Sequence, residues 1–222
     1  MHVFCTHEYM CTLEYMSTAT RTVSERKRAA ILESAERMFV RDGFADTNLD
    51  DVAADAHTSK VTIYSHFGSK EALFVAVIHG VVARRSAIGP AIDPLPTAAE
   101  LAPALTVLAS GIIETVRDRV VVGLRRVLIA EQPRHPSLAA AWRAATVDAT
   151  VDELTTHFTA LQRRGLLRTF PAANVARQFL WMLIGDALDV GLLDPSARLP
   201  PARSTAQNAV ELLLSAYGVR AE

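Results

Sequence analysis

The sequence has very little cysteine: Cys5 and Cys11 are the only two among 222 residues, and both lie near its beginning. No later cysteine is available for a disulfide, which favours a reducing compartment. Long apolar runs are missing too, since none approaches the roughly 18 residues of a membrane span. Residues 1–16 lack the cationic start and clean apolar stretch of a secretory signal. These absences predict a cytoplasmic protein without a membrane partner.

Motifs for catalysis and for metal binding are also missing. We find no phosphate-binding glycine loop, nucleophile elbow, His-Glu-x-x-His pair or plausible triad spacing. The Glu-x-x-His pairs of di-metal helical bundles are absent as well. His2 and His7 lie close to the two cysteines, but no second ligand pair follows at zinc spacing. We therefore expect no enzyme, no metal site and no cofactor.

The chain also lacks a strong net charge, because its 23 Lys and Arg residues nearly balance its 24 Asp and Glu residues. Phosphate attraction depends on the charges near the nucleic-acid backbone, so only a local patch could bind nucleic acid. Such a patch exists, because no acidic residue lies between Ala56 and Lys70. The question is what this acid-free segment contacts.

Half of the residues are hydrophobic, only 6% are aromatic, and no stretch alternates convincingly as a strand would. The abundance of Ala, Leu, Val and Arg favours helices. We predict an all-α protein of about nine helices. A first domain of three short helices is expected over residues 24–70. A helical domain follows over residues 71–222, and its residues 71–88 are expected to form a connecting helix.

The start of the chain reads differently from the rest. Residues 1–23 are expected to be a flexible extension that ends in a basic arm. The stretch before Met16 has no helical period. We therefore expect translation to begin at that methionine and residues 1–15 to be disordered or untranslated. Ser24 is then placed to cap the first helix.

Local signals divide the first domain into helices. Thr47, Ser59 and Ser69 are each placed to cap a helix. Gly43 occupies the position at which glycine commonly ends one. Residues 56–58 form the break between the second and third helices. Two short helices joined by a tight turn describe a helix-turn-helix, whose second helix enters the major groove of DNA.

The helix that begins at Ser59 has side chains suited to that groove. Lys60 can donate to guanine or to phosphate, and the hydroxyls of Ser59 and Thr62 suit base edges or phosphates. Val61 suits a thymine methyl group, and the Tyr64 hydroxyl suits a phosphate at the rim. These residue types in one acid-free helix predict a DNA-reading surface.

Each of these residues also has a more ordinary interpretation. Lys60 alone is a solvated lysine, and Tyr64 alone is a half-buried packing residue. The combination in one acid-free stretch nevertheless favours DNA contact. Lys70 adds its charge at the start of the fourth helix, where helix N–H groups attract anions. Ile63 and Phe67 are expected to face inward and hold the helix to the domain.

Residues 31–78 closely resemble the DNA-binding domain of the TetR family of bacterial transcriptional regulators. The matching elements are Ala35, Phe39, Gly43-Phe44, Thr47, Asp51-Val52-Ala53, Ser59-Lys60, Thr62-Ile63-Tyr64, His66-Phe67 and Ser69-Lys70-Glu71-Ala72-Leu73. The resemblance implies that the position matching Thr47 contacts phosphate and that those of the third helix and Lys70 contact DNA. The predicted DNA-binding residues are Thr47, Thr58, Ser59, Lys60, Val61, Thr62, Tyr64, His66 and Lys70.

Two positions depart from the family pattern. His57 stands where the turn usually has glycine, and we expect histidine to adopt the left-handed backbone geometry there. Val61 replaces a residue that is commonly small in the family, which adds an apolar contact or shifts the docking. Both departures bear on the operator sequence rather than on the family.

Prolines mark the joints of the second domain, and no strand is expected there. We predict helices near 97–117, 119–131, 136–164, 172–190 and 203–217. The last two are apolar almost all round, so they must be buried on every side. A two-fold dimer interface would bury their outer faces, although a tightly wrapped monomer core is the alternative. The predicted interface residues are Val175, Phe179, Leu183, Leu188, Val210, Leu213 and Leu214.

The second domain resembles the subgroup of TetR regulators typified by AefR, through the stretches IAEQPRHPSLAAAW, LQRRGLLR and ARQFLWMLIGDAL. This resemblance implies a homodimer that binds a small-molecule effector among the helices of 97–170. Aromatic residues at helical spacing are usually plain core, but an acid in an apolar helix needs a partner. The candidate pocket residues are Trp142, His157, Phe158, Trp181, Met182 and Asp186.

The resemblance implies a ligand-responsive repressor that binds a palindromic operator as a dimer and is released by a small effector. The apolar candidate pocket, with few polar groups, indicates that this effector is hydrophobic. Two alternatives stay open from the sequence. The protein could activate transcription, or it could be a helical ligand-binding dimer that has lost operator binding.

Overall fold

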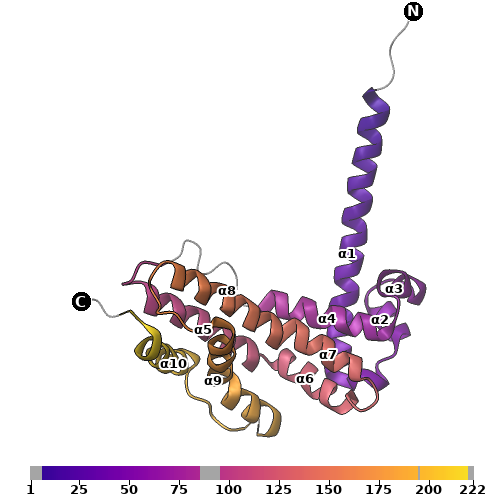
Figure 1. Ribbon diagram of the computed structural model, residues 1–222. Helices are drawn as coiled ribbons and strands as arrows, with labels where there is room; N and C mark the ends of the chain where they lie inside the picture. The colour runs from indigo at the N-terminus through magenta and orange to yellow at the C-terminus, as the bar shows by residue number, and fades with distance from the viewer. Residues whose placement is uncertain (1–6, 86–95, 195, 220–222) are drawn as a thin grey trace, which may run out of the picture. The chain divides into compact units, whose positions relative to one another are not determined.

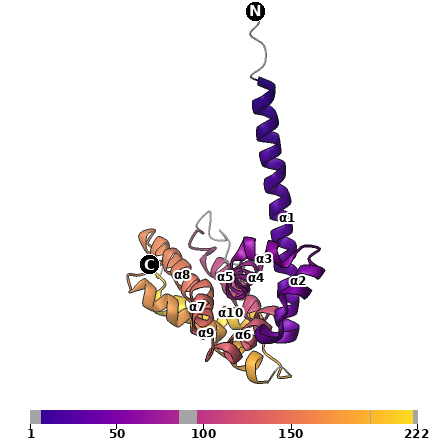
Figure 2. The same ribbon diagram turned by 90° about the vertical axis from the view of Figure 1, so that its right-hand side faces the viewer.

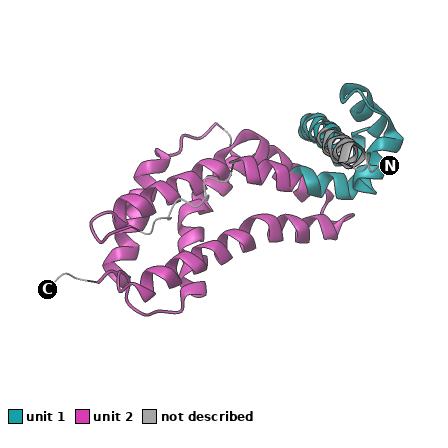
Figure 3. Cartoon of the chain, turned by 90° about the horizontal axis from the view of Figure 1, so that it is seen from above, with its two compact units in different colours: residues 1–77 teal, residues 78–222 magenta. Residues whose placement is uncertain are grey.

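A computed structural model of the chain describes residues 7–85, 96–194 and 196–219 (Figure 1). The chain divides into two compact units, Met1–Val77 and Ile78–Glu222 (Figure 3). In the first unit lie α1 (His7–Asp46), α2 (Leu49–Asp55), α3 (Lys60–Phe67) and the beginning of α4 (Lys70–Arg85). In the second lie α5 (Leu101–Arg117), α6 (Arg119–Glu131), α7 (Pro136–Arg143), η1 (Ala144–Asp148), α8 (Ala149–Arg163), α9 (Ala172–Leu193) and α10 (Ala202–Tyr217).

The π-helical segment η1 joins α7 to α8 without a break, so the three form one helix over residues 136–163. Counted in this way, the described part of the chain has nine helices and no named strand. The all-α prediction is confirmed. The only β-type pairing among the described residues is an isolated bridge between Leu167 and Gly218. None of the helices that the structure describes is both long enough and apolar enough to cross a membrane.

Helix α1 begins at His7 rather than at the predicted Ser24 cap (Figure 1). A flexible extension over residues 1–23 was therefore wrong for residues 7–23, and the part that concerns residues 1–6 lies outside the described residues. The physical reason is that no glycine or proline occurs from residue 7 to residue 42, so nothing breaks the helix. Helical geometry is lost at Gly43, with φ 85° and ψ 177°, as predicted.

Three phenylalanines form the centre of the first unit. The Phe39 ring lies 5.8 Å from that of Phe44 and 5.0 Å from that of Phe74, and the Phe44 and Phe74 centroids are 5.4 Å apart. Helix α2 packs on α1 and α3 packs on α2 (Figure 2). Because Phe74 belongs to this core, the unit extends to Val77, beyond the predicted boundary at residue 70.

In the second unit, α5, α8, α9 and α10 enclose a common apolar core. Helix α9 packs on α5, α8 and α10 of the same chain, so most of its apolar surface is covered without a partner. This corrects the predicted dimer interface, because most of its residues are fully buried in the chain's own core and two are partly buried against it. The fully buried residues are Val175, Phe179, Leu183, Val210 and Leu213, and the partly buried ones are Leu188 and Leu214.

The apolar side chains that α9 and α10 leave exposed are different ones. Trp181, Met182, Leu193 and Leu212 are 45%, 43%, 76% and 60% exposed. Met182 and Leu212 line the same shallow pocket between the two helices, with a volume of about 180 Å³. The solvent-facing side of α9 therefore also carries apolar residues, but fewer of them than the buried side.

Candidate DNA-binding surface and ligand cavity

The second helix of the candidate motif is capped by Asn48, and not by Thr47 as predicted. The Asn48 side chain accepts a hydrogen bond from the Asp50 N–H at 2.9 Å. Thr47 is buried, and its hydroxyl donates to the Gly43 carbonyl at 2.6 Å. The Thr47 hydroxyl thus fastens the start of α2 to the end of α1. The phosphate contact expected at the Thr47 position stays a prediction.

The turn between α2 and α3 has the predicted left-handed residue. His57 has φ 50° and is the only described residue other than glycine with a positive φ. The turn is closed by two backbone bonds, from His57 N–H to the Ala54 carbonyl and from Thr58 N–H to the Ala53 carbonyl, at 3.1 and 2.8 Å. Histidine is among the residues that adopt this geometry most readily, so the turn is kept without glycine.

Ser59 caps α3, as predicted. Its hydroxyl oxygen accepts a hydrogen bond from the Thr62 N–H at 3.2 Å and lies 2.9 Å from the Thr62 hydroxyl. Ser69 caps α4 in the same way, by accepting from the Ala72 N–H at 3.1 Å. The two caps fix the beginnings of α3 and α4.

Helix α3 presents one face to the core and the other to solvent. Ile63 is buried, as predicted, and Phe67 is half-buried beneath the guanidinium of Arg28, which lies 5.2 Å from the ring centroid. Val61 is 77% exposed and Tyr64 is 45% exposed. Two large apolar or aromatic residues one turn apart on a solvated helix indicate a surface that contacts something else.

The remaining predicted residues lie near this face. Lys60 and Ser59 are exposed, while Thr58, Thr62 and His66 are half-exposed. Lys70 begins α4, where its ammonium donates to the Ala45 carbonyl at 3.0 Å and lies 5.0 Å from the Phe44 ring. Helix α3, the turn before it and the beginning of α4 therefore carry all the predicted contact residues other than Thr47.

One contact on this surface was not predicted from the sequence. The Lys60 ammonium lies 2.9 Å from a carboxylate oxygen of Asp50 in α2, and both side chains are exposed. The hydrogen bond and the negative charge of Asp50 raise the pKa of Lys60 above its ordinary value. Residues ten apart on two different helices meet only through the turn, so no spacing rule within one helix could reveal this pair.

The second unit contains a small internal cavity of about 60 Å³. It is lined by Val82, Ile112, Thr115, Val116, Val121, Arg125, Trp142, Thr146, Val147, Thr150, Leu180 and Ile184. Val82 belongs to α4 and the rest come from α5, α6, α7, η1, α8 and α9.

Only one of the six predicted pocket residues, Trp142, lines this cavity. Phe158 belongs to the core, where its ring meets Phe170 and Phe179. Trp181, Met182 and Asp186 are exposed, so the expectation of a buried acid at Asp186 was wrong. The physical reason is that this face of α9 points to solvent, because α5, α8 and α10 cover the other sides.

The sixth residue, His157, lies half-buried on α8 outside the cavity lining. Its Nε2 lies 3.8 Å from a carboxylate oxygen of Glu153, one helical turn earlier. Burial lowers the pKa of His157 and raises the pKa of Glu153. Both shifts have the same cause, the partial burial of the two side chains, which disfavours their charged forms.

Sequence reasoning also missed Arg125. This half-buried side chain lines the cavity, and its guanidinium carbon lies 5.5 Å from the Trp142 ring centroid. Burial lowers the pKa of Arg125, but a guanidinium stays protonated in proteins. An arginine in an apolar helical pattern gives no sequence signal that separates a cavity residue from a surface one.

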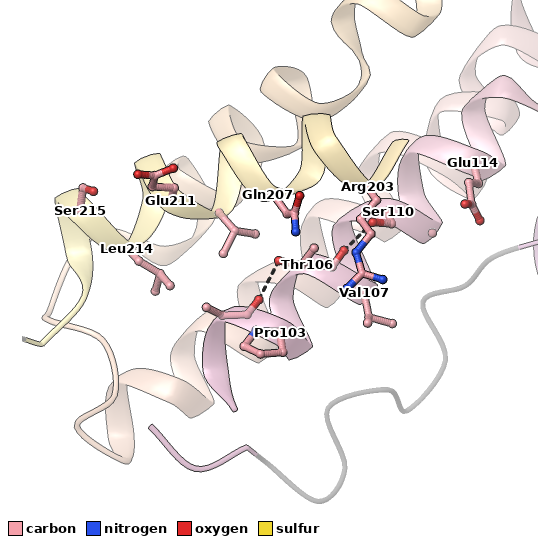
Figure 4. Close-up of a pocket in the computed structure, with 13 residues that line it drawn as sticks. Pro103, Thr106, Val107, Ser110, Glu114, Arg203, Gln207, Glu211, Leu214 and Ser215 are labelled. Carbon is pink, nitrogen blue, oxygen red and sulfur yellow. Dashed lines mark hydrogen bonds between the residues drawn. The ribbon is translucent and has the colours of Figure 1, made fainter. Parts of the chain in front are cut away.

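A larger open groove of about 940 Å³ lies between α5 and α10 (Figure 4). Its walls carry both charge signs, with Glu114, Glu211 and Arg203. The hydroxyls of Thr106 and Ser110 donate to carbonyls one turn back in α5, at 2.8 and 2.7 Å. The groove is therefore an open surface on which only the Thr106 and Ser110 hydroxyls are seen to be used within a helix.

The comparison with known families agrees with both units. Residues 31–77 match the family described as bacterial regulatory proteins of the tetR family. Residues 103–219, which are more than half of the chain, match the family described as the AefR-like transcriptional repressor C-terminal domain. The chain therefore belongs to the TetR family of bacterial regulatory proteins, in the group with an AefR-like C-terminal domain.

Curated relatives match over part of the chain. The HTH-type transcriptional regulator TtgR of Pseudomonas putida is 36% identical over 86 residues, which are 36% of this chain and 41% of that protein. EthR of Mycolicibacterium smegmatis is 33% identical over 93 residues, 36% of this chain and 43% of that protein. The chain thus spans less than half the length of these relatives.

Solved structures match over most of the chain. A TetR-family transcriptional regulator from Mesorhizobium loti has a TM-score of 0.77 and is 27% identical, covering 88% of this chain and 98% of that chain. The flavonoid-responsive regulator FrrA has a TM-score of 0.70 and is also 27% identical. The match covers 89% of this chain and 100% of the FrrA chain.

Proposed function

We propose that the protein is a transcriptional repressor that binds a palindromic DNA operator as a homodimer and leaves it when a small molecule occupies the second unit. The observation that carries the proposal is the outer face of α3. It places Lys60, Val61, Thr62 and Tyr64 on one capped helix without an acid in it. A helix of this kind reads base edges with its N-terminal residues and contacts phosphates with the rest.

The dimer rests on the exposed apolar residues of α9 and α10. Trp181, Met182 and Leu212 form an apolar surface that a second copy would cover by two-fold symmetry. Two recognition helices related by that symmetry fit successive major grooves, about 34–36 Å apart. The operator is therefore an inverted repeat, and the protein acts in the bacterial cytoplasm, at the nucleoid.

The effector site is the cavity that contains Trp142 and Arg125. Val82 lines it, and Val82 lies in the same helix as Lys70 at the edge of the DNA-binding surface. A ligand that enlarges the cavity displaces α4, which changes how the two recognition helices are spaced. Its mostly apolar walls favour an effector with an apolar body.

One experiment tests this function. The purified protein is mixed with fragments of genomic DNA from the source organism, and the fragments that it binds are selected and sequenced. Enrichment of a shared inverted repeat supports an operator-binding dimer. A reporter gene behind that repeat then gives the sign of regulation, since expression falls with a repressor and rises with an activator. Retention of fragments with no shared sequence would favour a helical ligand-binding dimer that has lost operator binding.

Asp50 provides a prediction about affinity. Asp50→Asn is expected to strengthen operator binding by about two- to fivefold, because it releases Lys60 from an exposed ion pair and removes a negative charge beside the DNA surface. Fluorescence anisotropy against the selected repeat measures the change. Glu33→Gln, at an exposed position of α1, removes the same charge elsewhere in the unit. Equal effects of the two substitutions, or none, would contradict a specific competition between Asp50 and DNA for Lys60.

A further inference from the structure

The half-buried Arg125 guanidinium has an unusual environment. Among the described residues, no carboxylate lies within ion-pair distance of it, and it lies over the face of the Trp142 ring. A partly buried charge is costly unless it is paired or hydrogen-bonded. Burial already lowers the pKa of Arg125, which is the direction expected for a cation without a nearby anion.

Trp142 supplies a second, independent observation in the same cavity. The residue is only 5% exposed, and its indole Nε1 has no hydrogen-bond acceptor among the described residues. Buried indole N–H groups normally find a partner, because leaving one unpaired costs free energy. One wall of the cavity thus holds a buried N–H without an acceptor, on Trp142, beside a half-buried cation, Arg125, without a carboxylate partner among the described residues.

The rest of the wall is mostly apolar. Ile112, Val116, Val121, Leu180 and Ile184 contribute side chains without hydrogen-bonding groups. The hydroxyl of Thr146 donates to the Trp142 carbonyl at 2.8 Å and is therefore already used. A ligand that fits must combine an apolar body with a strong acceptor at one end.

We propose that this cavity binds a small apolar carboxylate, whose anionic group is held by Arg125 and the Trp142 N–H and whose body lies against the apolar wall. This rests on the proposed function, because the same cavity is the effector site named above. Arginine and carboxylate form short, charge-assisted hydrogen bonds that a neutral ligand cannot reproduce. The anion satisfies both donors at once, and the ligand-free volume of about 60 Å³ must increase to admit it.

The consequence for regulation follows from the position of Val82. A ligand body larger than the ligand-free cavity pushes the wall outward, and Val82 is the part of that wall that belongs to α4. Carboxylate binding and DNA release are therefore coupled, and each weakens the other by the same factor.

The experiment compares three acids with their neutral counterparts of similar shape. Benzoate, 1-naphthoate and octanoate are tested beside benzyl alcohol, 1-naphthalenemethanol and 1-octanol, by calorimetry and thermal shift on the full-length protein. Arg125→Gln removes the charge from the cavity and Arg125→Lys keeps it. Arg119→Gln removes the same charge from the exposed beginning of α6 as the matched control. DNA affinity is measured for each variant without and with ligand.

We expect at least one acid to bind about 10- to 100-fold more tightly than its alcohol, since a charged hydrogen-bonded pair is lost with the alcohol. Arg125→Gln is expected to abolish that preference, Arg119→Gln to keep it, and Arg125→Lys to keep part of it. Equal affinity for acid and alcohol in the unmodified protein overturns the proposal, as does failure of all three acids to bind.

If Arg125→Gln does not fold, the proposal is still tested by the unmodified protein, through its affinity for each acid relative to the matching alcohol. Carboxylate binding without any DNA binding would reject the repressor function and leave this site intact. DNA binding that responds to the neutral compounds would support the repressor and reject the carboxylate.

Discussion

Lys60→Ala combined with Tyr64→Ala is expected to weaken operator binding by about 100-fold, because each side chain contributes about 1–3 kcal/mol of contact to base or phosphate. Both side chains lie on the exposed face of α3. Neither belongs to the core of the first unit, which Phe39, Phe44 and Phe74 form. The double substitution should therefore leave the midpoint of thermal unfolding almost unchanged while removing affinity.

The matched control for this variant is Arg163→Ala, which removes an exposed cation from α8 in the second unit. It should bind the operator as tightly as the unmodified protein. The double variant should also show a salt dependence reduced by about one phosphate contact for the loss of Lys60. A folded double variant with unchanged affinity would show that α3 is not the surface that reads DNA.

Met182→Glu combined with Leu212→Glu is expected to convert the protein to monomers. Both positions are exposed within one chain and line the same shallow pocket between α9 and α10, so the substitutions fit the isolated chain. In a two-fold interface they would place four carboxylates on an apolar surface, and each buried unpaired charge costs several kcal/mol. Sedimentation velocity measures the change in mass.

Operator affinity should fall with the dimer. A dimer that engages two half-sites gains about 100- to 10,000-fold over one engaged half-site, so the monomer loses that gain. Gln207→Glu is the control, because it adds a carboxylate to the face of α10 that lines the groove against α5. If Gln207→Glu separates the dimer and the Met182 and Leu212 substitutions do not, the interface lies on the other face of α10.

What the sequence predicted correctly was determined by local chemistry. Ser59 caps α3, Ile63 faces inward and His57 adopts a left-handed turn, because each depends on neighbours a few residues away. The cap of α2 was missed because Thr47 and Asn48 are both good capping residues. Tertiary contact decides between them, since the Thr47 hydroxyl is taken by the Gly43 carbonyl.

The errors in the second unit have a different cause. The apolar character of residues 172–190 predicted burial on every side, but one side of α9, which carries Trp181, Met182 and Asp186, is exposed in the single chain. Apolar composition cannot tell which sides the same chain covers and which sides a partner would cover. In this protein α5, α8 and α10 of the same chain cover α9. The pairs that matter most for function, Lys60 with Asp50 and Arg125 with Trp142, join different helices. No periodicity within one helix could reveal them.

The most direct test of the proposed function is an anisotropy titration of the selected inverted repeat and of a scrambled repeat at two salt concentrations. The unmodified protein should prefer the repeat strongly, should bind as a dimer, and should lose affinity steeply as salt rises. The Lys60 and Tyr64 double variant should lose the preference while it stays folded. Equal binding of the repeat and the scrambled sequence by the unmodified protein would contradict the assignment of α3 as an operator-reading helix.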